Sequence, residues 1–134
     1  MRNLLSAALL ALVLTLLWAA PARADCTVKS GQHVVLYGDE DDPSVLLWDT
    51  RLRLRDYHAA SYDEAKALLP HAQLVPPGTR AIVVTCVAAY VTSPYFNTPD
   101  DAVGVMIVSG PSHGHSYWVL RSDLRVVSKA KKSP

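Results

Sequence analysis

The 134-residue sequence lacks the short motifs by which common enzyme sites are found. It has only two cysteines, Cys26 and Cys86, and they are too far apart to form the paired-cysteine motif of a redox enzyme. It also lacks the Gly-x-Ser-x-Gly turn that presents a nucleophilic serine in α/β-hydrolases. We therefore predict a protein that is not an enzyme and that needs no cofactor.

The chain opens with an apolar segment. Arg2 gives a short positive start, residues 4–20 are apolar apart from Ser6 and Thr15, and Ala22-Arg23-Ala24 has the A-x-A form of a cleavage site. We predict that residues 1–24 are a signal peptide cleaved after Ala24 and that the protein is periplasmic or secreted. A transmembrane anchor is the alternative, because the stretch is near the lower length limit for spanning a bilayer.

The remaining chain shows no strong excess of one charge. Of the 13 lysines and arginines, Arg2 and Arg23 lie in the signal segment, which leaves 11 basic against 12 acidic residues. This balance gives no reason to expect nucleic acid as a partner. Without repeats or internal boundaries, residues 25–127 are expected to form a single β-rich domain with no membrane span, followed by a disordered basic tail over residues 128–134.

The two cysteines are expected to form one disulfide. Export brings Cys26 and Cys86 into an oxidising compartment, where two thiols in a small domain pair by default. The bond would close a loop of about 60 residues and tie the N-terminus to a strand in the middle of the sheet. A reactive or metal-bound thiol is the alternative.

Short apolar runs separated by turn residues predict a mainly β fold. Residues 105–108 and 117–120 flank a Gly/Pro/Ser-rich loop and predict a β-hairpin. Further strands are predicted at residues 32–37, 45–48 and 125–127, and residues 81–87 are expected to be the central strand, buried on both faces. Pro77 and Gly78 suit a type II turn.

Charged residues mark two further segments. Arg51-Leu52-Arg53-Leu54-Arg55 alternates strictly, which predicts a strand with its arginines towards solvent; a cationic stripe for a phosphate or polyanion is the alternative. Asp39, Glu40, Asp41 and Asp42 are interpreted as a solvated turn, and a hard cation such as calcium is the alternative ligand.

One short helix is predicted over residues 61–69. Ser61 and Glu64 have the spacing of a capping box, and Tyr62, Ala65, Leu68 and Leu69 share an apolar face. Pro70 is expected to end the helix, which would pack on the sheet.

The last half of the exported chain carries a series of motifs: Pro77-Gly78-Thr79, residues 105–110, Gly114, Trp118-Val119 and Ser122-Asp123-Leu124. Their order resembles that of bacterial SH3-like domains. The resemblance implies a small five-stranded barrel that acts as a binding module of the cell envelope, with peptidoglycan or peptides as ligands. The fold expected is thus a small SH3-like barrel, or a curled antiparallel sheet, with one short helix and one disulfide.

Two groups of side chains are candidate binding residues. Tyr90, Tyr95 and Phe96 in a long loop over residues 90–101, beside Trp118, offer an aromatic ligand-binding surface, or they cap the end of a barrel. His113 and His115 offer half of a zinc or copper site, and a solvated turn is the alternative.

The function predicted from these features is binding. We expect a non-catalytic interaction protein of the bacterial envelope, with a peptide, peptidoglycan or an envelope protein as partner. The alternatives are an inhibitor or immunity protein that blocks an exported enzyme with a protruding loop, and a weak periplasmic metal-binding protein that uses His113 and His115.

Overall fold

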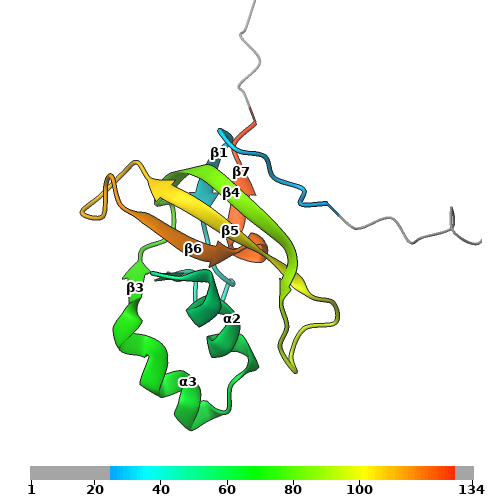
Figure 1. Cartoon of the computed structure of the whole chain (residues 1–134). Helices are drawn as coiled ribbons and strands as arrows, with labels where there is room; N and C mark the ends of the chain where they lie inside the picture. Colours follow the sequence, from blue (N-terminus) through cyan, green and yellow to red (C-terminus); the bar gives the residue numbers. More distant parts are fainter. Residues whose placement is uncertain (1–24, 129–134) are drawn as a thin grey trace, which may run out of the picture.

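The computed structural model describes residues 25–128 (Figure 1). The predicted signal peptide, and the predicted tail beyond Ser128, lie outside the described residues. The described elements are, in order, β1 His33–Leu36, β2 Val45–Trp48, α2 Arg51–Ala59, α3 Tyr62–Leu68, the 3-10 helix η1 Leu69–His71, β3 Ala72–Val75, β4 Arg80–Val91, β5 Asp100–Ile107, β6 Ser116–Leu120, the 3-10 helix η2 Arg121–Asp123 and β7 Leu124–Val126.

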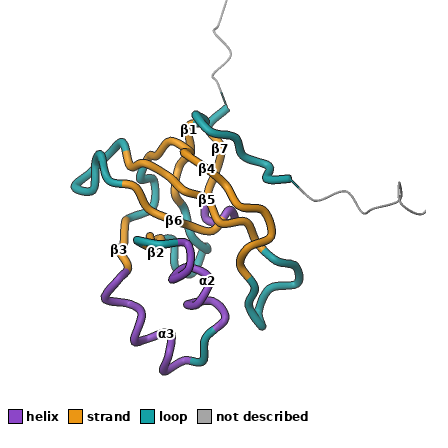
Figure 2. The backbone as a smooth tube through the Cα atoms, viewed as in Figure 1, coloured by secondary structure: helices purple, strands orange, loops and turns teal. Residues whose placement is uncertain are grey.

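The strands form one antiparallel sheet in the order β3-β2-β6-β5-β4-β1-β7 (Figure 2). The prediction of a mainly β fold with a curled antiparallel sheet is confirmed. The predicted hairpin is β5–β6, where Val105 pairs with Tyr117 and Val103 with Val119. Gly78 has a φ of +87°, as the predicted turn after Pro77 requires.

Alternate residues of the strands build a core on one face of the sheet. This core joins residues from all seven strands, including Val75 on one edge strand and Leu124 on the other. Side chains from both edges can meet only if the sheet curls around them, so this is the concave face. Its buried members are Val28, Val34, Leu36, Val45, Leu47, Val75, Ala81, Val83, Val103, Val105, Ile107, Val119 and Leu124.

The opposite face of the sheet carries a second core under helix α2. Figure 2 shows both helices on one side of the strands, and α2 contacts β2, β4, β5 and β6. Trp48, Leu54, Val91, Ala102 and Leu120 are buried here. The continuous apolar run of β2 follows from this arrangement, because Val45 and Leu47 enter the first core while Leu46 and Trp48 face the second.

The strand predicted at residues 51–55 is wrong: this segment is the first part of helix α2. Thr50 caps the helix, since its Oγ1 accepts a hydrogen bond from the backbone N–H of Arg53 at 3.2 Å. The guanidinium of Arg53 also pairs with Asp49, one turn earlier. Helical geometry separates the two leucines, so Leu54 is 1% exposed and Leu52 is 49% exposed. Residues 25–128 therefore contain two α-helices where one was predicted.

Four other sequence expectations need correction. The edge strand β3 follows the helices directly and was missed, because its four residues show no clear alternation. Strand β4 is longer than predicted and is not buried on both faces, since Val84 is 50% exposed; β5 is the middle strand. The predicted loop over residues 90–101 shortens to residues 92–99, because β4 and β5 extend into it.

Helix α3 begins after Ser61 as predicted, but the Ser61 side chain makes no capping hydrogen bond.

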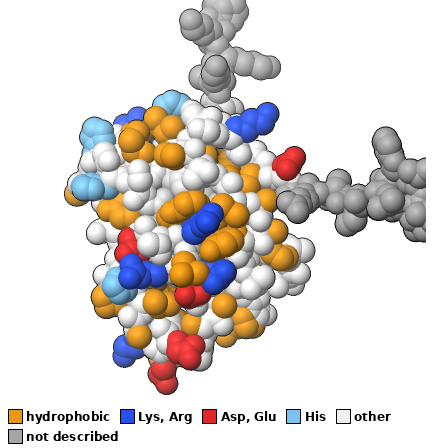
Figure 3. Space-filling view, viewed as in Figure 1, with side chains coloured by type: hydrophobic (Ala, Val, Ile, Leu, Met, Phe, Trp, Pro, Cys, Tyr) orange, Lys and Arg blue, Asp and Glu red, His pale blue; other side chains and the backbone are white. Residues whose placement is uncertain are grey.

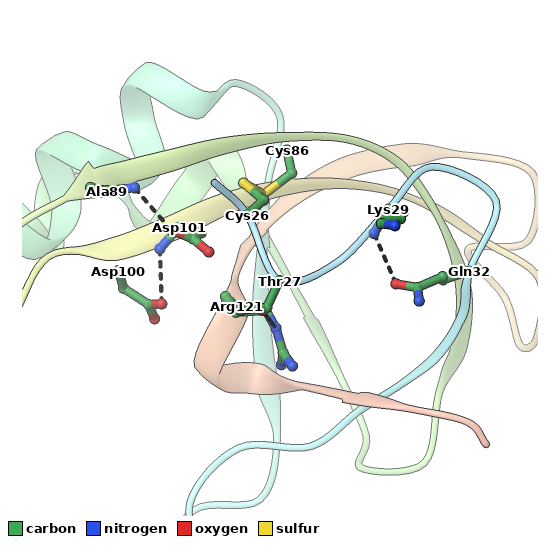
Figure 4. Close-up of a disulfide and its surroundings, with 9 residues drawn as sticks. All are labelled: Cys26, Thr27, Lys29, Gln32, Cys86, Ala89, Asp100, Asp101 and Arg121. Atoms are coloured by element: carbon green, nitrogen blue, oxygen red, sulfur yellow. Dashed lines mark hydrogen bonds between the residues drawn. A yellow bond between two sulfur atoms is a disulfide. The ribbon is translucent and has the colours of Figure 1, made fainter. Parts of the chain in front are cut away.

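The predicted disulfide between Cys26 and Cys86 is confirmed (Figure 4). It links the segment before β1 to the middle of β4, with the two Cα atoms 6.3 Å apart. Arg121 reinforces the same junction: its Nε donates to Thr27 Oγ1 and its Nη1 to the carbonyl of Leu124, both at 2.9 Å. Among residues 25–128, no helix is long and apolar enough to cross a membrane.

Candidate binding cleft

The predicted aromatic residues lie in two different environments. Tyr90, Phe96 and Trp118 are partly buried and pack against the core beneath α2, so they serve at least in part as structural side chains. Tyr90 also lies beside the guanidinium groups of Arg51 and Arg55, at 5.5 and 5.4 Å from its ring centre. Tyr95 is 93% exposed, in the loop between β4 and β5.

A cleft opens at the border of this second core, with a volume of about 410 Å³. It brings together residues from β2, β3, β6, α2, η2, the loop after β1 and the loop after β4. Its lining consists of the ring side chains Trp48, Tyr57, His58 and Phe96, the acids Asp39, Asp42 and Asp123, the leucines Leu46, Leu54, Leu74 and Leu120, and Gly38, Ser44 and Ser122.

Four ring side chains follow one another along one side of the cleft. The ring centres of Trp48 and Tyr57 are 4.8 Å apart, those of Tyr57 and His58 5.1 Å, and those of His58 and Phe96 5.5 Å. Trp48 is fully buried at the end of β2, which fixes one end of the series. The backbone N–H of Phe96 donates to the carbonyl of Ser93 at 3.1 Å, and this turn holds the other end. Tyr57, His58 and Phe96 are partly exposed, so these three rings are the members of the series that a ligand can contact.

The acidic residues of the cleft come from one loop and one short 3-10 helix. Asp39 and Asp42 lie between β1 and β2, and Asp123 lies in η2. The loop turns tightly at Gly38, whose N–H donates to the carbonyl of Pro43 at 2.8 Å. A Cβ at position 38 would lie 2.5 Å from the carbonyl oxygen of Asp42 and 2.7 Å from that of Ser44, so a glycine is required there. The backbone N–H of Tyr37 donates to the carbonyl of Asp123 at 2.9 Å, and this hydrogen bond joins the start of the loop to η2.

Two titratable groups in the cleft have shifted pKa values. Burial, followed by the negative charges of Asp39 and Asp100, raises the pKa of Asp123 to about 6. Burial lowers the pKa of His58, although the nearby carboxylate of Asp100 acts in the opposite direction. At neutral pH the cleft therefore holds an ionised but poorly solvated Asp123 and a neutral His58.

Asp100 positions the end of the cleft that contains η2. Its Oδ2 accepts hydrogen bonds from the Ser122 hydroxyl at 2.7 Å and from the Ser122 backbone N–H at 3.2 Å. The first residue of β5 thereby fixes the short helix that carries Asp123. The Ser122 hydroxyl donates to a carboxylate rather than to a histidine, so it is not arranged as the nucleophile of a serine hydrolase.

The predicted metal candidates lie elsewhere. His113 and His115 are exposed in the loop between β5 and β6, where Figure 3 shows histidine side chains at the surface. Over residues 25–128, Cys26, Cys86 and Asp101 are the one group of three possible ligands that lie close together. The two sulfur atoms of this group are joined in the disulfide, so they are not available as thiolate ligands.

Of the predicted ligand-binding residues, the structure brings only Phe96 into the cleft. Sequence reasoning missed the others, because Asp123 was interpreted as part of a turn and Tyr57 and His58 follow a segment predicted as a strand. The N-cap residue Thr50 was the signal that could have revealed α2, and hence the positions of Tyr57 and His58.

Comparison of the chain with protein-family models, with curated proteins and with solved structures found no match.

Proposed function

We propose that this protein is an exported, non-catalytic binding protein of the bacterial cell envelope, and that it holds its ligand in the cleft beside α2. The ligand class is a peptide, a peptidoglycan fragment or an extended segment of an envelope protein. The proposal is supported by the resemblance of the last half of the exported chain to SH3-like domains, which use the surface of a small barrel for binding.

The observation that carries the proposal is the composition of the cleft. Ring side chains, leucines and a few carboxylates around a volume of about 410 Å³ are typical of a small-ligand or side-chain pocket. Export is supported by the apolar segment at residues 4–20 and by the disulfide, because disulfides persist in oxidising compartments.

Two neighbouring residues allow a direct test. Phe96 lines the cleft, whereas Tyr95 points away from both cores and is 93% exposed. The exported chain, Phe96→Ala and Tyr95→Ala are each incubated with purified sacculi and with envelope extract, and retained protein is measured. We expect Phe96→Ala to lose retention and Tyr95→Ala to keep it. Thermal unfolding of each variant establishes that it is folded.

Inhibition of an exported enzyme is the second candidate function. It is favoured by Tyr95, which is presented between Pro94 and Phe96 in a loop that protrudes from the sheet (Figure 1). An inhibitor commonly inserts such an exposed side chain into the site of its target. A screen against lysozymes and proteases with the same two variants separates the functions, because inhibition through the loop would be lost in Tyr95→Ala.

A further inference from the structure

The cleft has an excess of negative charge. Three carboxylates, those of Asp39, Asp42 and Asp123, line it, and the lining contains no lysine or arginine. In the part of the chain that the structure describes, none of the three forms an ion pair with a lysine or arginine. Asp123 is partly buried, whereas Asp39 and Asp42 are exposed, and the negative charge of Asp39 acts on Asp123. A partly buried carboxylate beside a second negative charge and without a cationic partner is costly, and a bound cation would relieve that cost.

The ring side chains of the cleft favour the same kind of ligand. Tyr57 and Phe96 are partly exposed rings of the lining, Tyr57 is supported from behind by the fully buried Trp48, and aromatic rings attract ammonium and guanidinium groups. His58, between Tyr57 and Phe96, is neutral at pH 7 because burial lowers its pKa, so it does not repel a cation.

An apolar shelf adjoins the charged region. Leu46 on β2 and Leu74 on β3 are cross-strand partners that both line the cleft, and Leu74 is 59% exposed. Strand β3 is an edge of the sheet, beside which an extended chain can lie. The shelf is suited to the aliphatic part of a long basic side chain and to its apolar neighbours.

We propose that the cleft binds the lysine or arginine side chain of an extended basic peptide, with the charged group among Asp39, Asp42 and Asp123 and the aliphatic part against Leu46 and Leu74. This inference rests on the proposed binding function and adds its ligand class. An ammonium or guanidinium group forms charge-assisted hydrogen bonds to carboxylates, which are stronger than those between neutral groups.

Binding is expected to depend on pH. The charged and titratable groups around Asp123 are Asp39 and Asp42 on the loop after β1, Asp100 on β5, His58 on α2, and Arg121 and Arg125 on either side of it in the chain. Both arginines have other partners: Arg121 bonds Thr27 and Leu124, and Arg125 lies 4.2 Å from the ring centre of Tyr37. As pH falls through about 6, Asp123 loses its charge and the affinity for a cation decreases. Protonation of His58 at lower pH acts in the same direction.

The test uses four acetylated and amidated tripeptides in which a central lysine, arginine, glutamine or glutamate stands between two leucines. Binding to the exported chain is followed by NMR titration at about pH 7.5 and about pH 5. We expect the lysine and arginine peptides to bind at least about tenfold more tightly than the glutamine peptide, and the glutamate peptide to bind least. Affinity for the lysine peptide should decrease at the lower pH and with added salt.

Matched variants locate the site. Asp123→Asn should weaken binding of the lysine peptide by about tenfold and remove most of its pH dependence. Asp63→Asn, on the exposed first turn of α3, removes the same charge away from the cleft and should leave binding unchanged.

The outcomes distinguish this inference from the proposed function. If the glutamine peptide binds as tightly as the lysine peptide, or Asp123→Asn binds like the parent protein, the cationic ligand class is wrong while a binding cleft remains. If no tripeptide binds, although the parent protein is retained by sacculi and Phe96→Ala is not, the ligand class is again wrong and the binding function stands. If Phe96→Ala also has no effect on retention, both proposals fail.

Discussion

The side chain of Asp101 holds Ala89, a residue of strand β4 with a left-handed backbone conformation. Its Oδ1 accepts a hydrogen bond at 2.9 Å from the backbone N–H of Ala89, next to the disulfide (Figure 4). Ala89 has a φ of +51° and is the one non-glycine residue with positive φ in the described part of the chain. The pairing of β4 with β5 is irregular between Val87 and Val91, so Asp101 stabilises a bulge that bends β4.

This bulge gives a test with two adjacent alanines. A left-handed conformation costs a non-glycine residue about 1–2 kcal/mol, whereas glycine in an ordinary strand position costs about 0.5–1 kcal/mol. We expect Ala89→Gly to leave the free energy of unfolding unchanged or to raise it by up to about 1 kcal/mol, and Ala88→Gly to lower it by about 0.5–1 kcal/mol. Urea unfolding measures both. Equal losses for the two variants would contradict the left-handed backbone at Ala89.

The two leucines of α2 distinguish the helix from the strand that the sequence predicts. A strand would place Leu52 and Leu54 on one buried face, but the helix exposes Leu52 and buries Leu54. Leu54→Ala should lower the free energy of unfolding by about 2–4 kcal/mol because it leaves a cavity under α2. Leu52→Ala should change it by less than about 0.5 kcal/mol. Similar losses in chemical denaturation would favour the strand instead.

These leucines also show where sequence reasoning is sufficient and where it is not. The β5–β6 hairpin was predictable because apolar runs and turn residues are local signals. The disulfide was predictable because two cysteines permit a single intramolecular pairing. Over five residues, however, an alternation of arginine and leucine does not distinguish a strand from a helix that buries only Leu54.

The cleft could not be predicted from local patterns. Asp39 and Asp123 are brought together because β7 pairs with β1, which places η2 beside the loop that follows β1. Phe96 joins them from a loop between β4 and β5, and His58 from a helix that the sequence pattern did not reveal. Such a site depends on the curl of the sheet and on the position of α2, and neither leaves a signal in a short window of sequence.

Reduction of the disulfide should destabilise the protein strongly. Cys26 and Cys86 are separated by 60 positions, and closing a loop of that length removes about 4 kcal/mol of unfolded-chain entropy in the loop-closure model. We expect the double variant Cys26→Ser/Cys86→Ser to unfold at a markedly lower temperature and to be insensitive to dithiothreitol. The parent protein should match the variant only when dithiothreitol is present. A parent melting temperature that does not change on reduction would show that the cross-link contributes little.

The raised pKa of Asp123 predicts an unusual dependence of stability on pH. In the folded protein the carboxyl group of Asp123 keeps its proton up to about pH 6, whereas an aspartate in the unfolded chain loses its proton near pH 3.8. The folded state therefore binds more protons between these values, so the contribution of Asp123 to stability is greatest at the acid end and decreases as pH rises to about 6. His58 has the opposite effect, because its lowered pKa makes stability rise with pH as the unfolded histidine loses its proton.

Asp123→Asn isolates the first of these effects. The variant lacks the partly buried charge, so it should be more stable than the parent by about 2 kcal/mol at pH 7, with the difference shrinking towards pH 4. Urea unfolding of both proteins across this pH range measures the difference, and the contribution of His58 cancels to the extent that the two groups titrate independently. Asp63→Asn should show no such trend, since Asp63 is exposed on α3. A stability difference that does not vary with pH would mean that folding does not raise the pKa of Asp123. A variant that gains stability while it loses affinity for a basic peptide would show that the charge is kept for binding and not for folding.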